Sequence, residues 1–124
     1  MEPKVMIVDD DPYIRLAVKE ILNAEGINLA EADGYDECLE SMGWGFKGVI
    51  LMDIMMPEKD GWDTINAIVD KGYYEGNMIF MLTAKDQPDD KMEGLQEYVV
   101  DYLTKPFDPD LLVATVREYL GYLK

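Results

Sequence analysis

The sequence contains no histidine, and its only cysteine is Cys38. The absence of histidine excludes general-base catalysis by an imidazole of this chain. A lone cysteine cannot form an internal disulfide, which suits a reducing compartment, and we expect a cytoplasmic location. Long hydrophobic runs are missing as well. The apolar run Val5–Val8 is far too short for a signal peptide or a membrane span, so we expect no association with membranes.

Basic residues are scarce. Eleven Lys and Arg stand against 26 Asp and Glu, which gives a formal net charge of −15 at pH 7. A polyanion repels nucleic acid and anionic lipid, so direct binding of this chain to nucleic acid is not expected. The length of 124 residues fits one compact domain, and no repeat or linker divides it. We therefore expect a single domain over residues 1–124.

Short apolar runs recur along the chain and predict five strands. Several of them are apolar at nearly every position, which is typical of parallel strands buried on both faces. They cover residues 5–8, 27–30, 49–52, 78–82 and 99–103. The stretches between them predict helices, which gives an α/β fold with helices on both faces of one sheet.

Helix signals support this alternation. Asp11-Pro12 and Asp108-Pro109 each offer an N-cap followed by proline at the first helical position. The first of these helices carries an apolar stripe at helical spacing and is followed by Gly26 as a stop signal. Further helices are predicted over residues 35–42, 61–71 and 89–97.

Polar groups follow four of the five predicted strands. Asp9, Asp10 and Asp11 follow the first, and the others are Asp53, Thr83 and Lys105. Since the carboxyl ends of parallel strands meet at one edge of the sheet, we expect these groups to converge there. Glu31 follows the second strand, whose outer position would keep it away from the cluster.

Converging carboxylates need a compensating charge. Two of them at about 4 Å repel by roughly 4 kcal/mol at an effective dielectric constant near 20. Mg²⁺ is held by one or two carboxylates together with water and substrate phosphate. Asp9, Asp10 and Asp53 would be balanced by Mg²⁺ and Lys105. Asp11 is the better helix cap, which leaves the other two acids of its run for the metal.

Such a site has the parts for phosphoryl transfer. Asp53 can act as a carboxylate nucleophile, which needs no general base because it is already ionised. Lys105, the Thr83 hydroxyl and nearby backbone N–H groups would neutralise the oxygens of the transferred group.

Four motifs resemble a known family when taken together and in order. They are Val8-Asp9-Asp10, Met52 to Pro57 with Gly61, Leu82-Thr83-Ala84, and Tyr102 to Phe107. They resemble the receiver domain of two-component response regulators, and the resemblance covers essentially the whole chain. It implies a flavodoxin-like (βα)5 fold, a three-layer sandwich with strand order 2-1-3-4-5.

The same resemblance implies roles for single residues. Asp53 would be the phosphoacceptor, and Asp9, Asp10 and the Met55 backbone carbonyl would join it in binding Mg²⁺. Thr83 and Lys105 would contact the phosphoryl group, and Lys105-Pro106 would be a cis peptide. Tyr102 would be a switch residue coupled to Thr83, although a simple buried ring remains the alternative.

The resemblance also implies partners. The phosphoryl group would come from a phosphohistidine on a sensor histidine kinase or a histidine phosphotransfer protein. Phosphorylation would then change the affinity for an unknown downstream protein. Because transfer and hydrolysis are only self-assisted, we do not expect an enzyme.

Three alternatives stay open. A Mg²⁺-dependent phosphatase with an aspartyl-phosphate intermediate would place a second acid two residues after the nucleophile, where this chain has Met55. A flavodoxin would need a Ser/Thr/Gly-rich first loop in place of Asp9-Asp10-Asp11. A degenerate receiver that only binds partners would not need the intact acidic set. We also expect Met55 and Lys85 to hinder water and to prolong the phosphorylated state.

Overall fold

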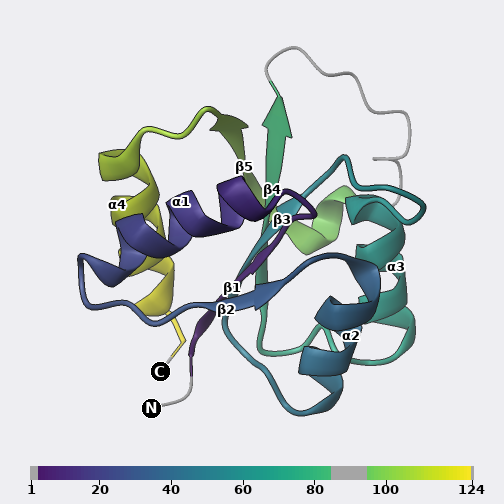
Figure 1. Ribbon diagram of the computed structural model, residues 1–124. Coiled ribbons are helices and arrows are strands. Elements are labelled where there is room, and N and C mark those ends of the chain that lie inside the picture. Colours follow the sequence, from purple (N-terminus) through teal and green to yellow (C-terminus); the bar gives the residue numbers. More distant parts are fainter. Residues whose placement is uncertain (1–2, 85–94, 124) are drawn as a thin grey trace.

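A parallel five-stranded sheet forms the centre of the molecule (Figure 1). The structure, a computed structural model, describes residues 3–84 and 95–123. The strand order is β2-β1-β3-β4-β5, as the family resemblance implied. The strands are β1 (Val5–Val8), β2 (Ala30–Ala32), β3 (Val49–Asp53), β4 (Met78–Ala84) and β5 (Val99–Lys105).

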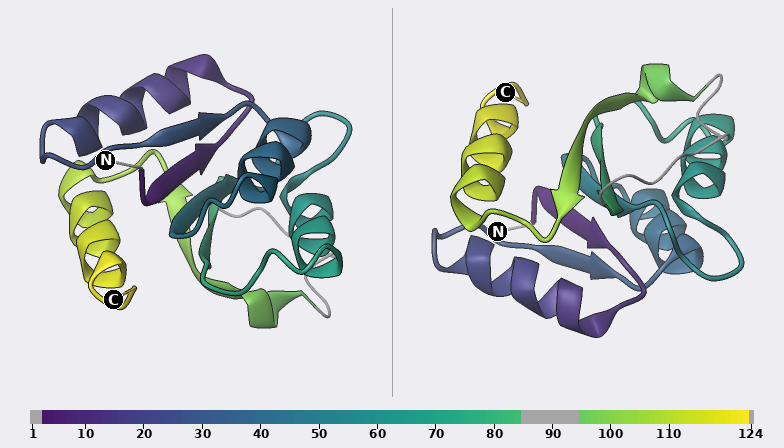
Figure 2. Two further views of the ribbon diagram at one scale, coloured as in Figure 1. Left: turned by 90° about the horizontal axis from the view of Figure 1, so that it is seen from below. Right: turned by 90° about the horizontal axis from the view of Figure 1, so that it is seen from above.

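Helices cover both faces of the sheet, which gives the three layers of a flavodoxin-like fold (Figure 2). One layer holds α1 (Pro12–Asn23) and α4 (Pro109–Leu120), and the other holds α2 (Tyr35–Gly43) and α3 (Gly61–Asp70). A single 3₁₀ turn, η2 (Gln96–Tyr98), precedes β5. None of the helices in the described ranges is long and apolar enough to cross a membrane.

Alternate residues of each central strand face opposite layers. In β1, Val5 and Ile7 pack toward α1 and α4, whereas Met6 and Val8 pack toward α2 and α3. The same alternation holds over residues 49–52 of β3 and 79–82 of β4, and all of these side chains are fully buried or nearly so. Because successive side chains of a strand point to opposite faces, an uninterrupted apolar run fills both cores.

The helix starts follow the caps expected from the sequence. Asp11 accepts a hydrogen bond from the Tyr13 N–H at 2.8 Å, and Asp108 accepts one from the Asp110 N–H at 2.9 Å. Each caps N–H groups that have no partner within the helix. At the start of α3, Asp60 and Asp63 form a reciprocal capping box that the sequence analysis missed.

Two predicted elements differ from the structure. The apolar run predicts the second strand at residues 27–30, which is wrong: β2 pairs with β1 only through Ala30, Glu31 and Ala32. The Ile27 N–H donates to the Leu22 carbonyl at 3.0 Å, so this residue closes the end of α1 instead of joining the ladder. The helix expected over residues 89–97 lies mostly outside the described residues, and its described end is the turn η2.

Candidate functional site

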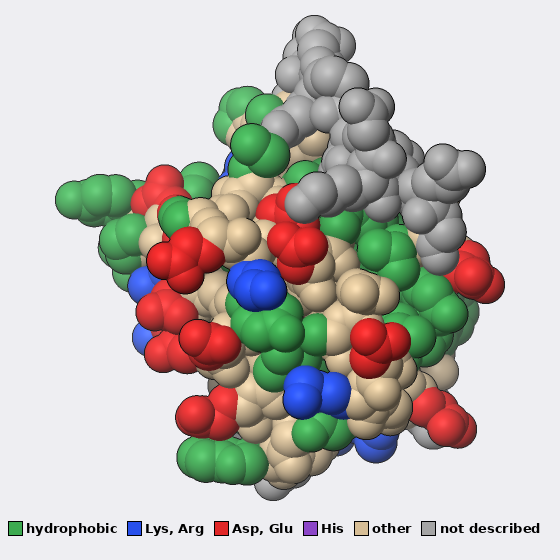
Figure 3. All heavy atoms as spheres, turned by 90° about the vertical axis from the view of Figure 1, so that its right-hand side faces the viewer, with side chains coloured by type: hydrophobic (Ala, Val, Ile, Leu, Met, Phe, Trp, Pro, Cys, Tyr) green, Lys and Arg blue, Asp and Glu red, His purple; other side chains and the backbone are tan. Residues whose placement is uncertain are grey.

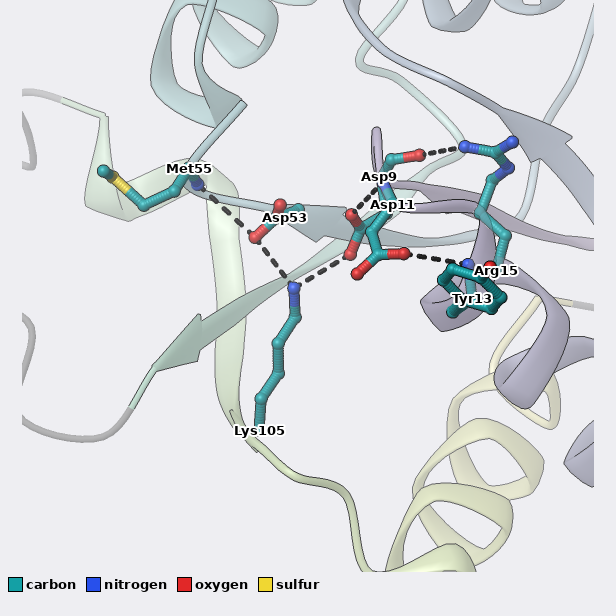
Figure 4. Close-up of polar contacts among 7 residues, drawn as sticks. All are labelled: Asp9, Asp11, Tyr13, Arg15, Asp53, Met55 and Lys105. Atoms are coloured by element: carbon teal, nitrogen blue, oxygen red, sulfur yellow. Dashed lines mark hydrogen bonds and ion pairs between the residues drawn. The ribbon is translucent and has the colours of Figure 1, made fainter. Parts of the chain in front are cut away.

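The site lies at the carboxyl edge of the sheet, where β1, β3 and β5 each end in a charged group. Asp9 follows β1 directly, Asp53 is the last residue of β3, and Lys105 is the last residue of β5. β3 lies between β1 and β4, so Asp53 stands near the centre of this edge. The convergence expected from the sequence is therefore present for these residues (Figure 4).

Lys105 joins the two buried acids. Its Nζ donates hydrogen bonds to Asp9 Oδ2 at 2.9 Å and to Asp53 Oδ1 at 3.1 Å. Burial alone would lower the pKa of Lys105, but its hydrogen bond to Asp9 and the negative charges of Asp53 and Asp9 raise that pKa above the ordinary value. The ammonium group therefore stays charged at neutral pH.

Asp53 is 6% exposed, and its surroundings disfavour the ionised carboxylate. The pKa of Asp53 is raised from 3.8 to about 6, mainly by burial and then by the charge of Asp9, while Lys105 opposes the rise. The Met55 N–H donates to Asp53 Oδ1 in a long hydrogen bond of 3.4 Å. A carboxylate in this position gains from any further positive charge placed beside it.

The turn between β1 and α1 holds Asp9 by main-chain and side-chain bonds. The Asp9 N–H donates to the Ala32 carbonyl at 3.1 Å, and Asp9 Oδ1 accepts from the Asp11 N–H at 2.9 Å. Arg15 Nη1 donates to the Asp9 carbonyl at 2.6 Å. Asp9 is 1% exposed, while its neighbour Asp10 is exposed.

Three carboxylates form a group suited to a cation. One oxygen each from Asp9, Asp10 and Asp53 lie within 4.8 Å of one another. With Lys105, the formal charge of the group is −3 + 1 = −2, which a divalent cation would neutralise. An all-oxygen set of this charge fits a hard divalent ion, whose attraction would also favour the ionised form of Asp53.

Thr83 lies on β4, one residue after Leu82, which pairs with Asp53 in the ladder, and Tyr102 lies on the neighbouring β5. The Thr83 hydroxyl donates to the Ala84 carbonyl at 3.0 Å. Tyr102 is half-buried and packs against the core between the sheet and the α2–α3 layer. Since Tyr102 pairs with Met81 in the ladder, it shares a sheet face with Met81 and Thr83. Their switch roles stay predictions.

Met55 lies at the rim of the site. The residue is 61% exposed, and its N–H donates to Asp53 Oδ1. The proposed metal ligation by its carbonyl stays a prediction, and Lys85 lies outside the described residues. The Lys105–Pro106 peptide is cis, as expected.

Sequence reasoning missed Arg15 as a neighbour of the site. Its guanidinium reaches the Asp9 carbonyl and lies 3.5 Å from Glu31. Glu31 itself stays outside the cluster, as expected, and pairs with Arg15 and Lys19 on α1. No sequence signal links a helix residue to a particular main-chain carbonyl.

Comparison with known proteins supports the resemblance to the receiver domain family independently of the site geometry. A family model described as the response regulator receiver domain matches residues 5–117. The transcriptional regulatory protein CpxR of Escherichia coli is 35% identical over 117 residues, which are 94% of this chain and 49% of CpxR. The phosphate regulon protein PhoB of Klebsiella pneumoniae is 31% identical over 94% of this chain and 51% of PhoB. The chain thus spans about half the length of the curated relatives it matches.

Solved structures agree with the sequence comparisons. A CheY-like receiver domain protein from Methanospirillum hungatei is 53% identical with a TM-score of 0.91, over 96% of this chain and 94% of that one. The chemotaxis protein CheY4 of Vibrio cholerae is 31% identical with a TM-score of 0.82, over 97% of this chain and all of that one. By sequence and by fold, the chain belongs to the receiver domain family of two-component response regulators, whose members are phosphorylated by histidine kinases.

Proposed function

We propose that this chain is a phosphoacceptor switch in which Asp53 takes a phosphoryl group from a phosphohistidine with the help of Mg²⁺. The donor would be a sensor histidine kinase or a histidine phosphotransfer protein. The observation that carries the proposal is the placement of the Asp53 carboxylate, which is buried, 3.1 Å from the Lys105 ammonium, and grouped with Asp9 and Asp10.

The two oxygens of Asp53 have different surroundings. Lys105 and the Met55 N–H both donate to Oδ1, and no described residue donates to Oδ2. A carboxylate oxygen of Asp53 attacks phosphorus while the bond from phosphorus to the histidine nitrogen breaks. The bonding electron pair stays on that nitrogen, and no proton has to leave Asp53, because ionised Asp53 is the attacking form.

Lys105 has a second task once the phosphoryl group arrives. Its ammonium lies between two carboxylates and donates to both, so it is positioned to shift toward a phosphoryl oxygen on Asp53. The Thr83 hydroxyl, which now bonds its neighbour's carbonyl, would turn to a second oxygen. Bound Mg²⁺ would supply the remaining positive charge against the phosphoryl oxygens.

The switch acts on other proteins in this proposal, and the chain is not an enzyme, because each phosphoryl group it accepts modifies the chain itself. Thr83 and Tyr102 share one sheet face, which offers a path from the site to the surface near η2. With a net charge of −15, the chain itself would not bind nucleic acid. We place it in the cytoplasm, whose reducing conditions suit its lone cysteine.

The phosphatase alternative gains nothing from the geometry. It needs a second carboxyl group two residues after the nucleophile to protonate the leaving group. Met55 occupies that position with an exposed thioether side chain.

The test is phosphorylation by a small donor. Wild type is incubated with acetyl phosphate and Mg²⁺, and intact mass is measured alongside Asp53→Asn. We expect one HPO₃ adduct in wild type and none in the variant. Asp70→Asn, which removes an exposed acid at the far end of α3, is the matched control and should be modified like wild type. An adduct that persists in Asp53→Asn would refute the assignment.

A further inference from the structure

Arg15 connects three parts of the fold beside the acidic site. It lies on α1, its Nη1 donates to the Asp9 carbonyl at 2.6 Å, and its Nε lies 3.5 Å from Glu31 Oε1 on β2. The side chain is 19% exposed, so much of its length is covered by protein. One guanidinium group thus ties the β1–α1 turn to the edge strand.

The bonded carbonyl has a particular position in the chain. It belongs to the peptide group that joins Asp9 to Asp10, so its direction sets the direction in which Asp10 leaves the strand. The preceding N–H of Asp9 is held by the Ala32 carbonyl at 3.1 Å. Asp10 is exposed, so core packing does not fix its carboxylate, and the orientation of this peptide is what remains to do so.

We propose that Arg15 is a positioning residue for the cation site: by holding the Asp9 carbonyl, it aims the Asp9 and Asp10 carboxylates at a common point. The inference rests on the proposed Mg²⁺ site. Figure 4 shows that Arg15 approaches the main chain of Asp9, whereas Lys105 approaches its carboxylate. Partners of this kind behind the direct ligands orient those ligands and tune metal affinity.

Simple electrostatics predicts the opposite effect of Arg15 on Mg²⁺ binding. A cation beside a metal site repels the metal, so the loss of the Arg15 charge alone would tighten Mg²⁺ binding. Loss of its positioning contact would weaken it. Lys19 offers a matched control because it lies on the same helix and pairs with the same Glu31 at 3.6 Å. Among the described residues, no hydrogen bond or ion pair joins Lys19 to the Asp9–Asp11 turn.

The first measurement is calorimetric titration of Mg²⁺ into wild type, Arg15→Gln and Lys19→Gln. We expect Arg15→Gln to bind Mg²⁺ about tenfold more weakly than wild type. Lys19→Gln, with the same charge change, should bind as tightly as wild type or more tightly. Phosphorylation by acetyl phosphate at varied Mg²⁺ should show a raised half-saturating concentration in Arg15→Gln and an unchanged rate at saturation.

Arg15→Lys keeps the positive charge but loses the guanidinium geometry, so it separates the effect of position from the effect of charge. It also replaces Arg15→Gln as the test variant if urea unfolding shows that Arg15→Gln does not fold. An ammonium group cannot reach the Asp9 carbonyl and Glu31 together in the way the branched guanidinium does. We expect Mg²⁺ binding weaker than that of wild type although the charge is kept. Folded Arg15 variants with wild-type affinity, or an equal loss in Lys19→Gln, would overturn the inference. A wild type that binds no Mg²⁺ would instead refute the proposed function.

Discussion

Asp53 shows how one residue combines a cost in stability with a function. Its carboxylate loses solvation on burial and faces Asp9, and Lys105 compensates only in part, so its pKa rises to about 6. In the free protein, the surroundings therefore disfavour the ionised form of Asp53 near neutral pH. A cation or a transferred phosphoryl group with its counter-charges changes that balance, which is why the site responds strongly to ligands.

The raised pKa of Asp53 predicts a pH-dependent stability. Native Asp53 keeps its proton up to about pH 6, whereas the unfolded chain releases it near 3.8. Between these values the native state binds more protons, so this group's contribution to the free energy of unfolding falls as pH rises. A shift of about two pKa units corresponds to about 3 kcal/mol.

Asp53→Asn, whose amide stays neutral, should therefore be more stable than wild type by up to about 3 kcal/mol at pH 8 without Mg²⁺. Near pH 4 the difference should shrink toward zero. Urea unfolding with a chelator at both pH values measures it. A variant that is no more stable than wild type at pH 8 would contradict the assignment of the pKa shift.

Met55 is predicted to limit hydrolysis of the phosphorylated form. Met55 is 61% exposed at the rim of the site, and its thioether cannot orient an attacking water by a strong hydrogen bond. Met55→Asn should shorten the lifetime of the adduct several-fold, as followed by intact mass after donor removal. Met55→Leu keeps an apolar side chain and should change the lifetime little. Equal lifetimes in wild type and Met55→Asn would show that the side chain is not a barrier.

The position of a site residue on its strand decides whether the sequence can predict it. Asp9 and Asp53 follow or end buried apolar runs, and Lys105 ends the partly exposed edge strand β5. Parallel strands bring such ends together whatever lies between. Arg15 was not predictable, because its partner is a main-chain carbonyl and nothing in the helical pattern marks that contact. Thr83 could be placed at the edge of the sheet, yet its hydroxyl orientation depends on a local bond to Ala84.

At the level of elements, the β3–α3 connection holds Asp53 in place. The Gly61 N–H donates to the Ile54 carbonyl at 2.8 Å, and Asp60 caps the helix that starts there. A Cβ at Gly61 would lie 2.5 Å from the Asp53 carbonyl oxygen and 3.0 Å from the Ile54 Cα. Glycine is therefore required by the close approach of two backbone segments.

Gly61→Ala should disturb both stability and function. The added methyl meets main-chain atoms of β3 that cannot rotate away, so either α3 or Asp53 must shift, at a cost of roughly 1–3 kcal/mol. Phosphorylation by acetyl phosphate should slow in the fraction that stays folded. Gly34→Ala is the control, because a Cβ there meets nothing within 4 Å and the residue has an extended φ of 167°. Equal urea midpoints for both variants would refute the packing argument.

The bounds of a strand were predicted closely where the apolar run and the hydrogen-bonded ladder cover the same residues. β1 and β3 lie in the sheet interior with both faces covered, so their buried runs mark their bounds closely. In the edge strand β2 the apolar pattern and the hydrogen-bonded ladder do not coincide. Ile27 and Leu29 are apolar because they pack under α1 and α4, not because they belong to the ladder. Burial and strand pairing are separate properties, and an apolar pattern reports only the first.

Charge acts at the scale of the whole molecule. The net charge is −15, and Figure 3 shows acidic side chains scattered over the face it presents, with basic ones at fewer places. This excess raises the repulsion within the folded chain, and any salt should relieve part of it by screening. A divalent ion held by Asp9, Asp10 and Asp53 should add a specific effect to that general one.

Mg²⁺ should therefore stabilise the protein more than NaCl at matched ionic strength. A ligand that binds only the native state, present at about 100 times its dissociation constant, adds about 2.7 kcal/mol to the free energy of unfolding. Thermal unfolding in the two salts measures the difference. Asp10→Asn is the decisive variant, because Asp10 is exposed and its loss leaves the core intact. It should respond to MgCl₂ and NaCl alike, whereas a wild type that fails to distinguish the two salts would mean that the acids act only as diffuse charge.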